Sequence, residues 1–218
     1  MKTEIFRYIK LFSGLFFCAL GAITVLKSEL GLPPWDVLNQ GTGIVSGITI
    51  GNASILIGIV IVIIDIMLGL SIGIGTIINF IIVGIFMDFI EDVNMVPEVT
   101  TLVGRVIELI FGIFFYSYGT YLYMIQGMGC GPRDGLMQIL IQKLHKSVTV
   151  VKNTIEIIVL LIGWYLGGTV GVGTVATAIM MGFLLEIFFK LGPVDIQDLK
   201  HRNLHEEYIH LKKVLKFK

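Results

Sequence analysis

The sequence predicts an all-α membrane protein with six transmembrane helices, arranged as two three-helix repeats of inverted topology. Of its 218 residues, 55% are hydrophobic and only 15% are charged, whereas about a quarter of the residues in a soluble domain are charged. Six long apolar runs follow one another along the chain, and the second half repeats the pattern of the first. This composition argues against a soluble enzyme. The 16 basic and 16 acidic residues cancel, so the chain has no positive field for nucleic acid.

Each apolar run approaches the roughly 20 residues that a helix needs to cross a bilayer. The runs cover residues 8–26, 52–69, 74–90, 105–126, 153–168 and 172–190, of which the third and fifth are short. They are too long and continuous for the alternating strands of an outer-membrane barrel. The first run follows a basic segment, as in a signal peptide. It has no clear small-residue cleavage site before Lys27, so we expect it to be retained.

The lysines and arginines are distributed unevenly over the connecting segments. Of the 16, 14 lie before or just inside the start of the first run, between the fourth and fifth runs, or at the end of the sixth run and beyond it. Only Lys27 and Arg105 fall on the other side. Because cytoplasmic loops carry the excess of positive charge, we expect both termini to be cytoplasmic.

An internal repeat divides the chain, because a shift of 98 residues places residues 7–88 on residues 105–186 without a gap. Each copy has three spans, so the second copy starts from the opposite side of the membrane, as in many secondary transporters. We expect a first repeat at residues 1–90, an extracytoplasmic linker at 91–104, an inverted second repeat at 105–190 and a cytoplasmic, polar and basic tail at 191–218. Matched pairs include Arg7 and Arg105, Gly14 and Gly112, Gly21 and Gly119, Pro34 and Pro132, Asp36 and Asp134, and Gln40 and Gln138.

A proline–aspartate segment follows the first span of each repeat, at residues 31–40 and 129–138. Proline stops the incoming helix and can open a new one. We therefore expect half-helices at about 36–44 and 134–144, too short to cross the membrane, lying at the interface or dipping into the bilayer. Two N-cap residues are expected at the starts of the next spans, Thr49 and Ser147.

The polar faces of these half-helices are the strongest candidates for a substrate path. Irregular backbone at membrane depth is tolerated only where protein or a water-filled cavity surrounds it. The candidate path residues are Asp36, Gln40, Arg133, Asp134 and Gln138. Asp36 has no basic sequence neighbour nearer than Lys27, so we expect it to meet a proton or a cationic solute. Arg133 would favour ionised Asp134 and offer an anion contact. The alternative is that both aspartates only cap the half-helices.

These segments resemble a bacterial family. The strings GLPPWDVL at 31–38, GPRDGL at 131–136 and GGTVGVGT at 167–174 are similar to those of the YczE/YyaS/YitT-type integral membrane proteins. The resemblance covers nearly the whole chain before the tail, although Pro33 stands where we expect a glycine. It implies a multi-span protein of the bacterial cytoplasmic membrane.

Two glycine-rich hairpins and two acidic residues inside spans are further candidates. Backbone N–H groups at a helix start can meet an anion, but no strand precedes these hairpins, and tight turns for helix packing are the alternative. The anion-contact candidates are Gly73, Gly75, Thr76, Gly171, Gly173 and Thr174. Ionisable residues inside spans are functional candidates, so Glu156 and Asp65 are candidates for binding a coupling ion, Glu156 the better of the two. The alternative for Glu156 is a structural pair with Lys152 or Arg133.

Three further expectations concern single side chains. Arg105 should pair with Asp88 or Glu108, and Tyr121 and Tyr123 should belong to an aromatic belt at the membrane surface. The tail histidines are more typical of a solvated or membrane-surface helix than of a metal site. They are His201, His205 and His210.

We find no nucleophile–base pair, zinc-binding helix or cofactor motif in the sequence, and expect no enzyme activity, metal or cofactor. The function that we predict is transport of a small solute by alternating access across the inverted repeat. The alternative is a non-transporting accessory or ligand-binding subunit that acts with a partner protein. The expected partner is the lipid bilayer. The sequence does not decide which small molecule or ion is the ligand, or whether the protein forms a homo-oligomer or binds a membrane partner.

Overall fold

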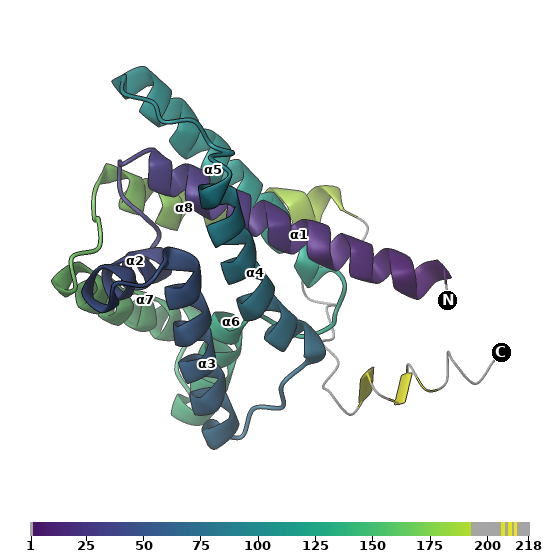
Figure 1. The fold of residues 1–218 in the computed structure, drawn as a ribbon. Coiled ribbons are helices and arrows are strands. Elements are labelled where there is room, and N and C mark those ends of the chain that lie inside the picture. Colours follow the sequence, from purple (N-terminus) through teal and green to yellow (C-terminus); the bar gives the residue numbers. More distant parts are fainter. Residues whose placement is uncertain (1, 193–205, 208, 211, 213–218) are drawn as a thin grey trace.

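The computed structural model describes residues 2–192, 206, 207, 209, 210 and 212, and these residues form helices and no strand (Figure 1). Six of the helices are long and apolar enough to cross a membrane. The other two are half-length and follow the first span of each half. In chain order the eight helices are α1 (Lys2–Lys27), α2 (Pro34–Ser46), α3 (Ile50–Leu68), α4 (Ile74–Asp92), α5 (Leu102–Met124), α6 (Pro132–Leu144), α7 (Val148–Tyr165) and α8 (Val172–Leu191).

The helix starts follow from the local sequence. Both half-helices, α2 and α6, begin with a proline, which lacks an N–H and has a helical φ. The predicted N-caps are confirmed, since Thr49 and Ser147 each accept a hydrogen bond from a backbone N–H three residues on. Of the two spans expected to be short, α4 has 19 residues and α7 has 18, the fewest of the six.

The first helix of each half forms the centre of the structure, where α1 and α5 cross (Figure 1). Small residues let the two backbones approach. Gly14 lies against Gly119, and Gly21 lies against Gly112. The contacts run in opposite order along the two chains, so α1 and α5 are antiparallel.

Each half-helix packs on a span of the other half. α2 lies along α7, and α6 lies along α3. The loops before the half-helices are also held across the halves, because Gly173 N donates to Leu30 O (2.6 Å) and Gly75 N donates to Met128 O (2.8 Å). Gly31 and Gly129, whose φ values are 112° and 131°, sit directly against the opposite hairpin.

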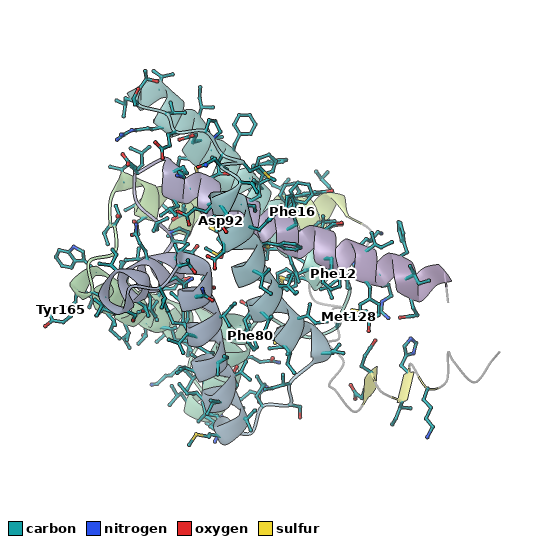
Figure 2. All side chains as sticks on the ribbon, viewed as in Figure 1. Phe12, Phe16, Phe80, Asp92, Met128 and Tyr165 are labelled. Atoms are coloured by element: carbon teal, nitrogen blue, oxygen red, sulfur yellow. The ribbon has the colours of Figure 1, made fainter. Side chains whose placement is uncertain are left out.

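The two halves differ in how their second and third spans meet. α3 packs closely on α4, with Gly51 against Gly84 and Gly58 against Phe80, which Figure 2 places between these helices. Asp88 on α4 joins the pair, accepting from Thr49 Oγ1 (2.6 Å) and Gly51 N (2.9 Å). α7 and α8 are not packed in this way over their described lengths.

Large apolar side chains cover the outside of the long helices. Those exposed include Ile63, Phe111, Ile158 and Phe183, on four of the six spans. Such an apolar surface suits lipid rather than water. At the other end of the chain, His210 contacts Glu4 of α1 (3.0 Å). His201 and His205 lie outside the described residues.

Candidate functional site, a cavity between the two halves

A cavity of about 270 Å³ lies among helices of both halves. Most of its lining residues come in pairs separated by the repeat offset, such as Asp36 with Asp134 and Trp35 with Arg133. The starts of both half-helices reach it. Its polar and aromatic lining is formed by Trp35, Asp36, Ser54, Asn79, Phe80, Tyr116, Ser117, Thr120, Tyr123, Arg133, Asp134, Lys152, Glu156 and Thr177.

Arg133 bridges the two half-helices. Its guanidinium lies over the Trp35 ring, 5.2 Å from the centroid. Nη2 donates to Asp36 Oδ1 (3.4 Å), and Nη1 donates to the Tyr116 hydroxyl (3.3 Å). The expectation that Asp36 has no nearby cation is therefore wrong. The two residues are 97 positions apart, and only the packing of the halves brings them together.

Asp36 is almost completely buried, with 2% of its surface exposed. Oδ1 accepts from Asn39 Nδ2 (3.1 Å) as well as from Arg133. Oδ2 is buried and has no hydrogen-bond partner among the described residues. A buried acceptor left unpaired is destabilising by about 1–3 kcal/mol. The cavity therefore contains an unused hydrogen-bond acceptor.

Asp134 accepts from the Tyr123 hydroxyl through Oδ2 (3.2 Å). Tyr123 is buried in the protein, so its expected place in an aromatic belt is wrong, and the same holds for Tyr121. Neither aspartate is an N-cap, although a carboxylate in the first turn complements the helix dipole. The N-cap residues of the half-helices are Pro33 and Gly131, neither with a side-chain cap bond, and both aspartates lie inside the first turn.

Lys152 and Glu156 line the cavity from α7, one turn apart, with Nζ and Oε1 separated by 3.8 Å. Of the two partners considered for Glu156, the structure places Lys152 beside it. Both side chains are partly exposed.

Other candidates lie outside the cavity lining. Gln40 accepts from Thr169 N (2.6 Å), which fixes α2 to the turn after α7, and Gln138 is exposed. Asp65 is completely buried beside Gly135 of α6, and neither of its carboxylate oxygens has a partner among the described residues.

The two glycine hairpins contact the loops before the half-helices. Thr76 Oγ1 donates to Cys130 O (2.6 Å), whereas Thr174 Oγ1 accepts from Gly171 N (3.2 Å) within its own hairpin. The N–H groups of Gly75 and Gly173 donate to loop carbonyls. These groups are occupied in the structure, which favours the packing interpretation over anion contact.

The partner of Arg105 differs from the one expected from the sequence, and the surroundings of Cys130 add a feature that the sequence did not indicate. Arg105 pairs with Glu29 (2.6 Å), not with Asp88 or Glu108, because the loop after α1 comes beside the start of α5. Burial raises the pKa of the Cys130 thiol to about 11, and the Asp134 carboxylate acts in the same direction. No group of metal-binding side chains occurs among the described residues.

Sequence reasoning missed several lining residues, chiefly Trp35, Tyr116 and Asn79. A signal for some of them was present in the repeat. Asn79 and Thr177 are repeat mates on the third span of each half, and both are polar. Ser54 and Lys152 are polar repeat mates on the second span. Trp35 carries no such signal, because its role depends on the cation that lies over it.

Comparison with known proteins agrees with the membrane fold. The model of the "Family of unknown function (DUF6198)" matches residues 5–190. A Haemophilus influenzae protein, described as "Uncharacterized protein", is 37% identical over 178 residues, which cover 82% of this chain and 81% of that protein. No solved structure matches the chain.

Two Bacillus subtilis proteins are also similar. The "Uncharacterized membrane protein YczE" is 34% identical over 204 residues, which cover 92% of this chain and 93% of the relative. The "Uncharacterized protein YyaS" is 25% identical over 188 residues, or 85% and 93% of the two chains. The sequence resemblance to these proteins is thereby confirmed, and an integral membrane protein is supported.

Proposed function

This chain belongs to the DUF6198 family and is an integral membrane protein, and we propose that it moves a small solute by alternating access between two inverted three-span repeats. The antiparallel crossing of α1 and α5 supports the inversion. Gly14 meets the repeat mate of Gly21, and Gly21 meets the repeat mate of Gly14. A two-fold axis through this crossing would exchange the halves.

The observation that carries the proposal is the asymmetry around the shared cavity. At the α3–α4 contact, Ser54, Phe80 and Gly84 are buried. Their repeat mates on α7 and α8, which are Lys152, Ala178 and Gly182, are exposed and line the cavity. Alternating access requires one repeat to be closed while the other is open.

The expected topology gives this asymmetry a direction. With both termini cytoplasmic, the start of α7 and the end of α8 lie on the cytoplasmic side. The start of α3 and the end of α4 lie outside. The open pair of spans would then connect the cavity to the cytoplasm, and the closed pair would separate it from the outside.

The contact at Asp88 would act as the outer latch. Asp88 ties the end of α4 to the start of α3 through Thr49 and Gly51. Its repeat mate is Glu186, which pairs with Lys190 on its own helix (2.7 Å). In the opposite state, Glu186 would accept from Ser147 and Thr149, the mates of Thr49 and Gly51, and close α7 onto α8.

We now favour Asp65 over Glu156, which the sequence preferred, as the candidate for binding a coupling proton. Ionisable residues inside a span that lack a partner are typical of proton and ion pathways. Asp65 fits this description, and it lies beside Gly135, next to Asp134 of the cavity. Glu156 has a cation beside it. A movement of α6 would change the exposure of Asp65.

Flux into liposomes tests transport directly. The purified protein is reconstituted and screened by solid-supported membrane electrophysiology against amines, amino acids, carboxylates, sugars and metal cations, with and without a pH gradient. We expect a solute-dependent signal that Asp36→Asn reduces and protein-free liposomes lack. No flux for any class, together with stoichiometric co-purification of another membrane protein, would instead support the accessory-subunit alternative.

A further inference from the structure

Charged side chains of both signs line the cavity. Asp36 pairs with Arg133, and Glu156 pairs with Lys152. The ligand class therefore depends on the polar atom that lacks a partner, and a carboxylate oxygen without one favours a charged donor.

The hydrogen bonds of the cavity indicate the chemistry of the ligand. Arg133 already donates to Asp36 and Tyr116 and stacks on Trp35. Among the described residues that line the cavity, the buried polar atom without a hydrogen-bond partner is Asp36 Oδ2, an acceptor on a side chain that is 98% buried, as its 2% exposure shows. An ionised carboxylate only accepts hydrogen bonds, so the ligand that satisfies this atom must donate one.

The half-helix starts do not reverse this preference for a cation. A helix N-terminus attracts anions through its dipole, and both α2 and α6 begin at the cavity. Each, however, starts with a proline that has no N–H, and each has an aspartate of its own in the first turn. The dipoles are therefore matched by side chains of the chain itself.

The rest of the wall is aromatic and apolar. Trp35, Phe80 and Tyr116 contribute rings to the lining, and Met87 and Met181 contribute flexible apolar side chains. Aromatic faces attract organic cations. A cavity of about 270 Å³ is small beside the pockets of roughly 300–1,000 Å³ that hold drug-sized ligands.

Building on the proposed transport function, we propose that the solute is a small amine in its protonated form, with its ammonium group bound to Asp36. The ammonium donates a hydrogen bond to Oδ2, and the carbon skeleton of the amine packs on the aromatic wall. Arg133 competes with the ligand for Asp36, so it sets the affinity without anchoring the ligand.

Binding to the purified full chain tests the charge class. The probes share one skeleton and differ in one group: butylammonium, butanol and butyrate, with 2-phenylethylammonium as an aromatic amine. Calorimetry should give at least one of the amines a dissociation constant ten-fold or more below those of butanol and butyrate. Tighter binding of butyrate, or no binding of either amine at millimolar concentration, would overturn the proposal.

Two variants test the atom that is assigned. Asp36→Asn should weaken amine binding at least ten-fold. Asp92→Asn removes the same charge from the exposed end of α4 and should leave binding unchanged. Arg133→Gln should tighten amine binding, because it frees Asp36 from its competing cation. Weaker amine binding in Arg133→Gln would contradict the assignment of Asp36 as the binding residue. This variant tests the assignment even if Asp36→Asn does not fold.

Flux separates this inference from transport itself. Amine binding without flux would keep the ligand class and reject transport. Flux of an anionic or neutral solute by a protein that binds no amine would keep transport and reject the ligand class.

Discussion

At the scale of single residues, the Asp36–Arg133 pair joins the two halves at the cavity. Its atoms are 3.4 Å apart, a long contact, and 27% of the Arg133 side chain is exposed. The pair is therefore weaker than a fully buried ion pair, and solvent screens part of it. The pair acts mainly by positioning, since it holds the starts of α2 and α6 on opposite sides of one cavity.

We expect Asp36→Asn and Arg133→Gln to interact in a double-mutant cycle. Each change removes one partner of the same contact, so the loss in the double variant should be smaller than the sum of the single losses. The coupling should be about 1 kcal/mol, within the range for residues in contact. Unfolding of the purified protein by SDS titration measures it.

The exposed pair of Glu29 and Arg105 provides the control for this cycle. These residues also join the two halves, but Glu29 is 64% exposed in its side chain. Surface pairs contribute about 0–1 kcal/mol, so Glu29→Gln and Arg105→Gln should be close to additive. Full additivity at Asp36 and Arg133 would show that the pair does not couple the half-helices.

At the scale of helices, glycines decide which pairs can touch. A Cβ at Gly21 would meet the backbone of Gly112 and Tyr116 on α5, and neither backbone can yield without moving its helix. At Gly182 of α8, a Cβ would meet nothing within 4 Å. A Cβ at its repeat mate Gly84, on α4, would lie 2.6 Å from Gly51 O.

We expect Gly21→Ala and Gly182→Ala to have different effects on stability and flux. Gly21→Ala should lower the free energy of unfolding by about 1–3 kcal/mol, as overpacking does. Gly182→Ala should leave stability equal or higher, since alanine favours a helix by about 1 kcal/mol. It should nevertheless slow flux, because the added methyl would obstruct closure of α7 onto α8. Thermal unfolding and flux distinguish the two, and unimpaired flux in Gly182→Ala would count against that closure.

Much at this scale could be predicted from the sequence. Proline and the hydroxyl N-caps have local effects, so the half-helices and the starts of α3 and α7 could be located to within a few residues. The partner of Arg133 could not be predicted in this way. Adjacency in the sequence favoured Asp134, whereas the contact with Asp36 depends on tertiary packing. The burial of Tyr123 was missed for the same reason. The looser packing of α7 and α8, compared with α3 and α4, has no sequence signal, since both halves carry the same pattern.

At the scale of the whole molecule, orientation depends on the positive charges. The 14 lysines and arginines assigned to one side predict that both termini are cytoplasmic. In a background of Cys18→Ala and Cys130→Ser, we expect an impermeant maleimide to label Asn94→Cys on intact cells and not Lys216→Cys. Labelling of the tail from outside would invert the topology and, with it, the side to which the cavity opens.

Two states of one molecule should be visible through matched pairs of cysteines. Ile55 lies against Gly84 where α3 meets α4, so Ile55→Cys with Gly84→Cys should form a disulfide in the state described here. The repeat mates are Asn153 and Gly182, both exposed on the open side. Asn153→Cys with Gly182→Cys should form a disulfide only after α7 closes onto α8.

In the same cysteine-free background, we expect each pair to cross-link when present alone, and each disulfide to abolish flux until it is reduced. In a protein that carries both pairs, one disulfide should exclude the other, because closure of one repeat requires opening of the other. Protease cleavage in the 91–104 linker, followed by mass spectrometry, identifies which disulfide each molecule holds. Molecules that hold both disulfides would show that the halves close independently, and alternating access would not describe this protein.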